Sequence, residues 1–133
     1  MRVVVLTTDT IHHNYFVTKI NELDIDVYVI CEKPKKLAHQ ELYYSSFKSQ
    51  KRIFDKKRDE YELLRWFESK PVRLSMFENF YKVDDVNSEK SLNIINQLKP
   101  DLIIVFGTGK IKENILKTFK KYIFNLHGGN TEK

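Results

Sequence analysis

The sequence predicts an α/β protein with a doubly wound, mainly parallel sheet of about five strands and helices on both faces. Two observations predict it. Short apolar runs rich in β-branched residues, typical of strands buried on both faces, alternate along the chain with segments of helical periodicity. The chain has 133 residues, of which 41% are hydrophobic and 31% charged, which is the size and composition of one globular domain. We therefore expect a single α/β domain.

The first half of the chain begins with a strand, a helix and a second strand. Residues 2–7, RVVVLT, form an apolar run that predicts a buried strand. Residues 10–23 place apolar side chains at helical spacing and predict a helix: Ile11, Tyr15, Phe16 and Ile20. Residues 27–31 form a second buried-strand run, after which Pro34 breaks the chain.

A long helix is predicted over residues 47–68, and Pro71 stops it. Its aromatic residues recur at spacings that suit packing against the sheet, so we expect a core role for them rather than stacking on bases: Phe47, Phe54, Tyr61, Trp66 and Phe67. Basic residues crowd the same segment: Lys48, Lys51, Arg52, Lys56, Lys57 and Arg58. We interpret them as a solvated helix face, with attraction of a phosphorylated acceptor or an RNA as the alternative.

The second half of the chain predicts three further strands separated by helices. Residues 81–83 form a weak strand, and a helix capped by Asn87-Ser88 ends at Pro100. Residues 101–106 form a clear buried strand, residues 112–119 a short helix and residues 123–126 a fifth strand. This regular alternation indicates βαβ units, and therefore a Rossmann-like parallel sheet covered on both faces.

Composition excludes several classes of protein. The longest apolar runs are about a quarter of the roughly 20 residues needed to cross a bilayer, and the opening segment lacks the features of a signal peptide. We expect a cytoplasmic protein that does not contact a membrane. The lone Cys31 cannot form an internal disulfide, and no Cys or His pattern has metal-ligand spacing, so no metal is expected. The formal net charge of +5 suggests an anionic partner.

The ligand site is expected at the carboxyl ends of the strands, near the point where the strand order reverses. This rule selects residues 7–13, 107–110 and 125–130. All four glycines of the chain lie in the last two of these segments. Glycine is used where the backbone takes a positive φ or another group approaches closely. The candidate substrate-binding residues at this edge are Thr8, His12, His13, Gly128 and Gly129.

The common nucleotide-binding signatures fit poorly. A dinucleotide site needs Gly-x-Gly-x-x-Gly after a strand, and Gly107 and Gly109 supply only two of the three glycines. A Walker A sequence is excluded because Gly109-Lys110 is followed by Ile111. A phospho-accepting receiver would need an acidic pair after the first strand, where only Asp9 is present.

The segment after residue 123 suggests acyl transfer. The alternation of side chains along a strand puts Asn125 and His127 on the same side of the chain. An Asn amide can donate a hydrogen bond to a developing oxyanion, and a His can relay a proton between the attacking amine and the departing nitrogen. Neither role needs a metal.

Two stretches, KPDLIIVFG over residues 99–107 and FNLH over residues 124–127, resemble the folate-dependent formyltransferases. The N-terminal domain of that family ends its fifth strand in Asn-x-His after a similar strand and a glycine-bearing loop. The resemblance implies that Asn125 and His127 are catalytic and that N10-formyltetrahydrofolate is the formyl donor. It further implies that the pterin of the donor is bound, largely through backbone groups, by Phe106, Gly107, Thr108, Gly109, Lys110 and Ile111.

The resemblance also implies that something is missing. The third catalytic residue of the family, an Asp, lies tens of residues beyond the His, whereas this sequence ends at Lys133. We therefore expect residues 1–133 to be a single formyltransferase N-terminal domain that is incomplete at its C-terminus and has little activity alone. A sheet that ends at its fifth strand exposes an edge, which favours self-association.

The acceptor is not fixed by these motifs. The chain lacks both the glycine-rich loop of glycinamide ribonucleotide formyltransferases and the Gly-Thr-Pro of methionyl-tRNA formyltransferases. The segment Thr7–Phe16 and the His-Gly-Gly at residues 127–129 look more like the branch that formylates amino groups on nucleotide-linked sugars. The alternatives are methionyl-tRNA formylation, or a non-catalytic α/β module that binds a nucleotide or RNA through its basic helix.

Overall fold

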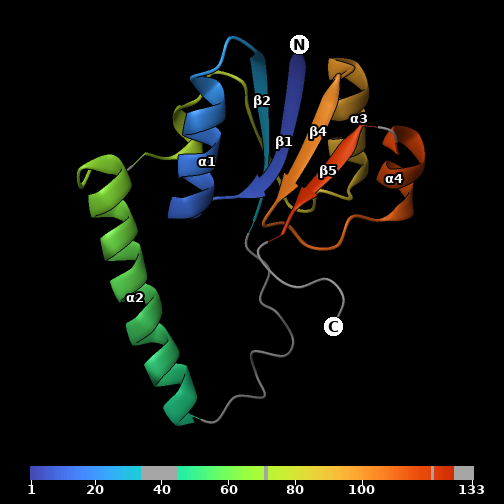
Figure 1. The fold of residues 1–133 in the computed structure, drawn as a ribbon. Coiled ribbons are helices and arrows are strands. Elements are labelled where there is room, and N and C mark those ends of the chain that lie inside the picture. The colour runs from blue at the N-terminus through green and yellow to red at the C-terminus, as the bar shows by residue number, and fades with distance from the viewer. Residues whose placement is uncertain (34–44, 71, 121, 128–133) are drawn as a thin grey trace.

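The computed structural model describes residues 1–33, 45–70, 72–120 and 122–127 (Figure 1). Its centre is a five-stranded, all-parallel sheet in the order β3-β2-β1-β4-β5. The strands are β1 (Arg2–Thr8), β2 (Asp26–Glu32), β3 (Phe80–Val83), β4 (Leu102–Phe106) and β5 (Ile123–Leu126). The strand order reverses at β1, so the predicted Rossmann-like α/β fold is confirmed.

Helices cover both faces of the sheet (Figure 1). Helix α1 (Ile11–Asn21) covers one face, where Val3 and Val5 of β1 pack with Val17. Helices α3 (Glu89–Leu98) and α4 (Glu113–Phe119) cover the other face, where a second cluster is built from Val4, Leu6, Ile95, Ile103 and Ile115. Successive side chains of β1 point into the cores on opposite faces of the sheet, so β1 is apolar at almost every position. A one-turn 3₁₀ helix, η2 (Leu74–Met76), precedes β3.

The register between β4 and β5 shows toward which face of the sheet each β5 side chain points. Val105 of β4 lies opposite Asn125 of β5, and Phe106 lies opposite Leu126. Paired residues of neighbouring strands point to the same face, so Asn125 shares the face of α3 and α4, whereas Leu126 shares the face of α1. Phe124 and Leu126 are 62% and 42% exposed. Among the described residues no helix covers this end of the α1 face, and β5 pairs only with β4.

Helix α2 (Ser45–Phe67) corrects an expectation. It extends away from the sheet and meets α1 near its C-terminal end (Figure 1), where Trp66 and Phe67 contact the Tyr15 ring at centroid distances of 4.8 and 5.9 Å. Three aromatic residues expected in the core are instead 48%, 65% and 64% exposed: Phe47, Phe54 and Tyr61. The core role is wrong for these three, because periodicity defines an apolar helix face but not what lies opposite it.

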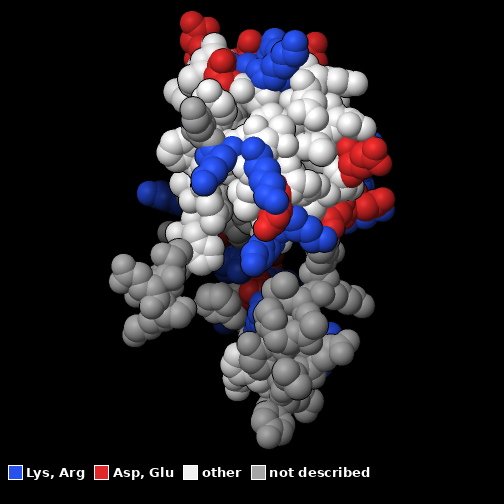
Figure 2. All heavy atoms as spheres, turned by 90° about the vertical axis from the view of Figure 1, so that its right-hand side faces the viewer, with Lys and Arg blue, Asp and Glu red and all other residues white. Residues whose placement is uncertain are grey.

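The surface over α3 and α4 mixes charges of both signs. Figure 2 shows this side of the molecule, where basic and acidic side chains are interspersed on a largely uncharged surface. The net charge of +5 is therefore not gathered on this side. Within the described ranges, no helix combines the length and apolar character required to span a bilayer.

Candidate functional site

A pocket of about 520 Å³ lies beyond the carboxyl ends of β4 and β5. Pockets of roughly 300–1,000 Å³ are typical of small-molecule sites, and this edge of a parallel sheet is where they usually form. Both candidate catalytic residues, Asn125 and His127, line it. So do five residues of the candidate donor-binding loop: Gly107, Thr108, Gly109, Lys110 and Ile111.

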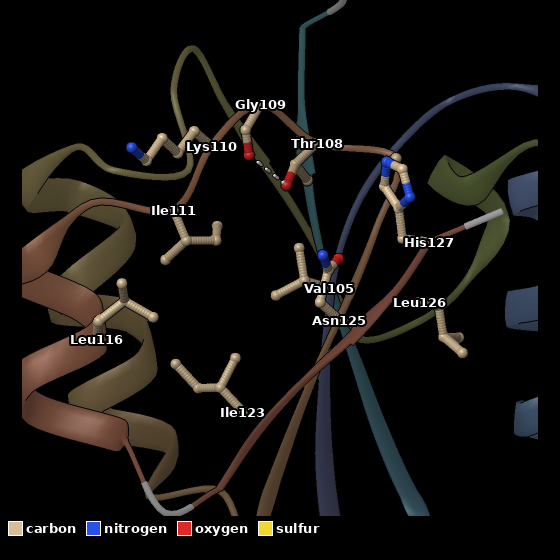
Figure 3. Close-up of a pocket in the computed structure, with 11 residues that line it drawn as sticks. Val105, Thr108, Gly109, Lys110, Ile111, Leu116, Ile123, Asn125, Leu126 and His127 are labelled. Atoms are coloured by element: carbon tan, nitrogen blue, oxygen red, sulfur yellow. Dashed lines mark hydrogen bonds between the residues drawn. The ribbon is translucent and has the colours of Figure 1, made fainter. Parts of the chain in front are cut away.

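The two candidate catalytic side chains have different neighbours in the pocket (Figure 3). Ile111, Leu116 and Ile123 gather at one side, and the Asn125 amide lies between this apolar group and the His127 ring. Both Asn125 and His127 are exposed to solvent. The arrangement offers an amide donor and an imidazole next to an apolar wall, at a place that a ligand can reach.

The loop over residues 107–112 is held from outside the pocket by Glu32, a residue that the sequence reasoning did not identify. Glu32 ends β2 and is 2% exposed. Its Oε1 accepts the Gly109 N–H at 2.8 Å, and its Oε2 accepts the Val86 N–H at 3.1 Å. The available signal was a carboxylate directly after the buried run at residues 27–31, since a buried charge requires partners.

Asn87, in the loop before α3, fixes the same loop over residues 107–112. Its side-chain nitrogen donates to the Lys110 carbonyl oxygen at 3.0 Å, and its Oδ1 accepts the Lys112 N–H at 2.6 Å. The Asn114 side chain donates to the Asn87 carbonyl oxygen at 3.1 Å. The sequence marked residue 87 only as part of a helix cap, although its side chain bridges two loops at the rim.

On the α1 side of the sheet, His13 is packed against Gly107. Gly107 has a φ of +80°, and a Cβ at this position would lie 1.9 Å from His13 Cε1, so both conformation and space require glycine. The His13 ring lies edge-on to Phe106 at 4.5 Å. Its Nδ1 lies 3.1 Å from the Thr8 carbonyl oxygen and 2.9 Å from the Thr8 hydroxyl, which in turn donates to the Gly107 carbonyl oxygen.

The environment of His13 keeps its ring neutral. Burial, together with the nearby His12, lowers the pKa of His13 to about 4, although a hydrogen bond to the Thr8 backbone acts in the opposite direction. A neutral ring with the proton on Nδ1 can donate to Thr8. His13 thus joins β1, α1 and the loop after β4, and its geometry suits packing better than contact with a substrate.

His12 points toward α2. Its Nε2 lies 3.3 Å from Thr10 Oγ1, and its Nδ1 lies 3.5 Å from Oε2 of Glu62, which is 9% exposed. The candidate site residues therefore form two neighbouring groups. Thr8, His12, His13 and Phe106 gather at the start of α1, the loop with Asn125 and His127 lines the pocket, and Gly107 contacts both groups. Gly128 and Gly129 fall outside the described residues.

The described residues form neither a metal-ligand cluster nor a reactive thiol. No group of three or more His, Cys, Asp or Glu side chains is placed there to hold a metal ion. Cys31 is buried in β2, and burial raises the pKa of its thiol to about 11, which keeps it protonated at neutral pH.

Comparison with known proteins finds no family model that matches this sequence and no matching curated protein.

Proposed function

We propose that the protein transfers a formyl group from N10-formyltetrahydrofolate to a primary amine in the pocket beyond β4 and β5. The observation that carries the proposal is that Asn125 and His127 line one pocket together with the loop Gly107–Ile111. This combination brings an amide donor, an imidazole and a backbone surface to one solvent-accessible place. The resemblance of residues 99–107 and 124–127 to the folate-dependent formyltransferases supports the same reaction.

The reaction needs an oxyanion donor and a proton relay. The acceptor amine attacks the formyl carbon, and the carbonyl oxygen takes the electron pair as a tetrahedral intermediate forms. The Asn125 side chain donates a hydrogen bond to this oxyanion, which is the kind of interaction that strengthens as charge develops. His127 accepts the proton that the amine loses and returns it to N10 of the folate as the carbon–nitrogen bond breaks. The products are the formylated amine and tetrahydrofolate.

The walls of the pocket suit a flat heteroaromatic ring with polar edges. Ile111, Leu116 and Ile123 offer apolar contact to the faces of such a ring (Figure 3). The loop beside them offers backbone N–H and C=O groups to its edge. The pterin of the formyl donor has this chemistry, so it would bind here with its formyl group directed toward Asn125 and His127.

The acceptor that we propose is an amino group on a nucleotide-linked sugar. This choice follows the resemblance of the segments after β1 and β5 to the branch of the family that uses such acceptors. Methionyl-tRNA is the alternative within the same reaction class. Formylation assays with each acceptor, using the full-length protein, separate the two.

Calorimetric titration of the full-length protein with 5-formyltetrahydrofolate, a stable isomer of the donor, tests the proposal. We expect saturable binding that Asn125→Ala weakens, and formyl transfer that Asn125→Ala and His127→Ala reduce. Asn96→Ala is the matched control, since Asn96 is an exposed residue of α3 outside the pocket. Wild-type protein that neither binds the folate nor transfers a formyl group would overturn the proposal.

A second candidate function is favoured by the exposure of α2. Base stacking requires aromatic rings that are exposed among basic residues, and Phe47, Phe54 and Tyr61 meet this condition. Part of the positive charge is neutralised, because Lys51 pairs with Asp55 and Lys56 with Glu60. Four cations of α2 have no ion-pair partner among the described residues: Lys48, Arg52, Lys57 and Arg65.

Binding of a single-stranded RNA oligonucleotide, followed by fluorescence anisotropy at several salt concentrations, tests this second candidate. Replacing Lys48, Arg52 and Lys57 by Gln should lower both the affinity and its salt dependence. An unchanged affinity and salt slope would leave formyl transfer as the one candidate.

A further inference from the structure

We infer that Glu32 is a positioning residue for the formyl donor, an inference that rests on the proposed function. Glu32 lies at the end of β2, away from the two strands that bear the pocket. Its carboxylate nevertheless reaches the pocket loop, where it accepts the Gly109 N–H at 2.8 Å. It therefore acts on the donor site through the loop and not by touching the ligand.

The chemistry of the contact requires a carboxylate. Glu32 is 2% exposed, and a buried carboxylate must be compensated by hydrogen bonds or by an opposite charge. Here two peptide N–H groups from different loops, those of Gly109 and Val86, each donate to one of its oxygens. A Gln side chain has a single oxygen, so its NH₂ group would face one of these two N–H donors.

The contact fixes the orientation of the loop. Gly109 is held through its N–H by Glu32, and Lys110 is held through its carbonyl oxygen by Asn87. The next fixed group is the Lys112 N–H, which also donates to Asn87. Between these points the N–H groups of Lys110 and Ile111 make no hydrogen bond to another described residue. They are backbone donors on a loop that lines the pocket, and the edge of a pterin could use them.

The two hydrogen bonds that Glu32 accepts join three parts of the protein: β2, the loop before α3 and the loop after β4. Because Glu32 accepts from Val86 as well as from Gly109, the loop is anchored to the strand on the far side of β1 from β4. Weakening this anchor should loosen the donor site while leaving Asn125 and His127 in place, since both belong to the segment of β5. The acceptor site would change less than the donor site.

The test is Glu32→Gln in the full-length protein, with Glu62→Gln as the matched control. Glu62 is also a buried carboxylate, but it lies on α2 beside His12 and outside the pocket. We expect Glu32→Gln to raise the KM for N10-formyltetrahydrofolate about tenfold, the scale of losing one buried hydrogen bond to a charged group. The KM for the acceptor should change less than about twofold, and Glu62→Gln should leave the donor KM unchanged.

Amide hydrogen exchange at Gly109 gives a readout that does not depend on the reaction. Exchange at this amide, or at the Val86 amide, should accelerate in Glu32→Gln and not in Glu62→Gln, because the single Gln oxygen leaves one of the two N–H groups without its acceptor. A donor KM in Glu32→Gln equal to that of the wild type would overturn the inference. So would equal changes in both KM values together with equal losses of stability in the two variants, since this pattern indicates general destabilisation.

Failure of the inference and failure of the proposed function give different results. If the wild-type protein binds no folate, the proposed function fails and the inference fails with it. If the wild-type protein binds 5-formyltetrahydrofolate and Glu32→Gln binds it equally well, only the inference fails.

Discussion

The two sides of the sheet at its carboxyl edge carry histidines in opposite situations. On the α1 side, His13 is 5% exposed, is packed against Gly107 and has its pKa lowered to about 4. On the other side, His127 is exposed and lines a pocket with Asn125. A proton relay must be within reach of the reacting groups. The closed side therefore suits a structural histidine, and the open side suits chemistry.

The largest effect should follow removal of the exposed imidazole. His127→Ala should lower formyl transfer by about 10²–10⁴-fold, the usual contribution of a positioned acid–base group. The measurement is kcat/KM in the full-length protein. Its thermal stability should stay near that of the wild type, because the His127 side chain is exposed. Activity within about threefold of the wild type would contradict a catalytic role for His127.

On the α1 side, a substitution next to His13 should lower the stability of the protein. Gly107→Ala should lower the free energy of unfolding by about 3 kcal/mol or more, because it combines a positive φ with a Cβ 1.9 Å from His13 Cε1. Gly109→Ala is the control, since a Cβ there would lie 3.7 Å from Glu32 Oε1, an ordinary contact. Urea unfolding measures both. Equal losses in the two variants would contradict the packing described for His13.

The lowered pKa of His13 predicts a pH dependence of stability. As the pH falls below 6.5 the unfolded chain binds a proton at this residue, whereas the folded protein resists it down to about pH 4. Stability is therefore present above pH 6.5 and is lost toward pH 4, by about 1–2 kcal/mol after allowance for solvent screening. Urea unfolding at several pH values should show a flatter slope in His13→Gln. An identical slope would mean that His13 titrates normally.

The smallest effect concerns α2, where an exposed aromatic residue and a packed one should contribute differently to stability. Phe54→Ser should change the free energy of unfolding by less than about 0.5 kcal/mol, because the side chain is 65% exposed. Trp66→Ala should cost about 1–2 kcal/mol, because it removes the ring that stacks on Tyr15 at 4.8 Å. If thermal or urea unfolding shows the reverse order, α2 is packed by a different face.

The fold could be predicted from the sequence because its signals are local. The run at residues 2–7 became β1 (Arg2–Thr8), and the pattern over residues 112–119 became α4 (Glu113–Phe119). Parallel-sheet topology then located the rim, and strand alternation predicted that Asn125 and His127 share a side. The structure lines one pocket with both of these residues.

The remaining features depend on contacts between distant parts of the chain. Glu32 and Gly109 are 77 residues apart, so no local pattern could pair them. The side of the sheet on which His12 and His13 lie follows from the handedness of the β1–α1–β2 connection, which no short motif encodes. The exposure of Phe47, Phe54 and Tyr61 depends on what covers α2, and the spacing of apolar residues carries no information about that.

The central position of β1 in the sheet has a consequence for how the chain folds. β1 is the central strand, yet its neighbour β4 comes late in the chain, and the Arg2 N–H donates to an Asp101 oxygen across a sequence separation of 99 residues. Closing so long a loop is slow, and strand pairings of this range lower folding rates. During synthesis, one edge of β1 stays open until residues 102–106 leave the ribosome. The apolar centre of the sheet is thus exposed to aggregation until then, and completion of β4 is the step that ends this exposure.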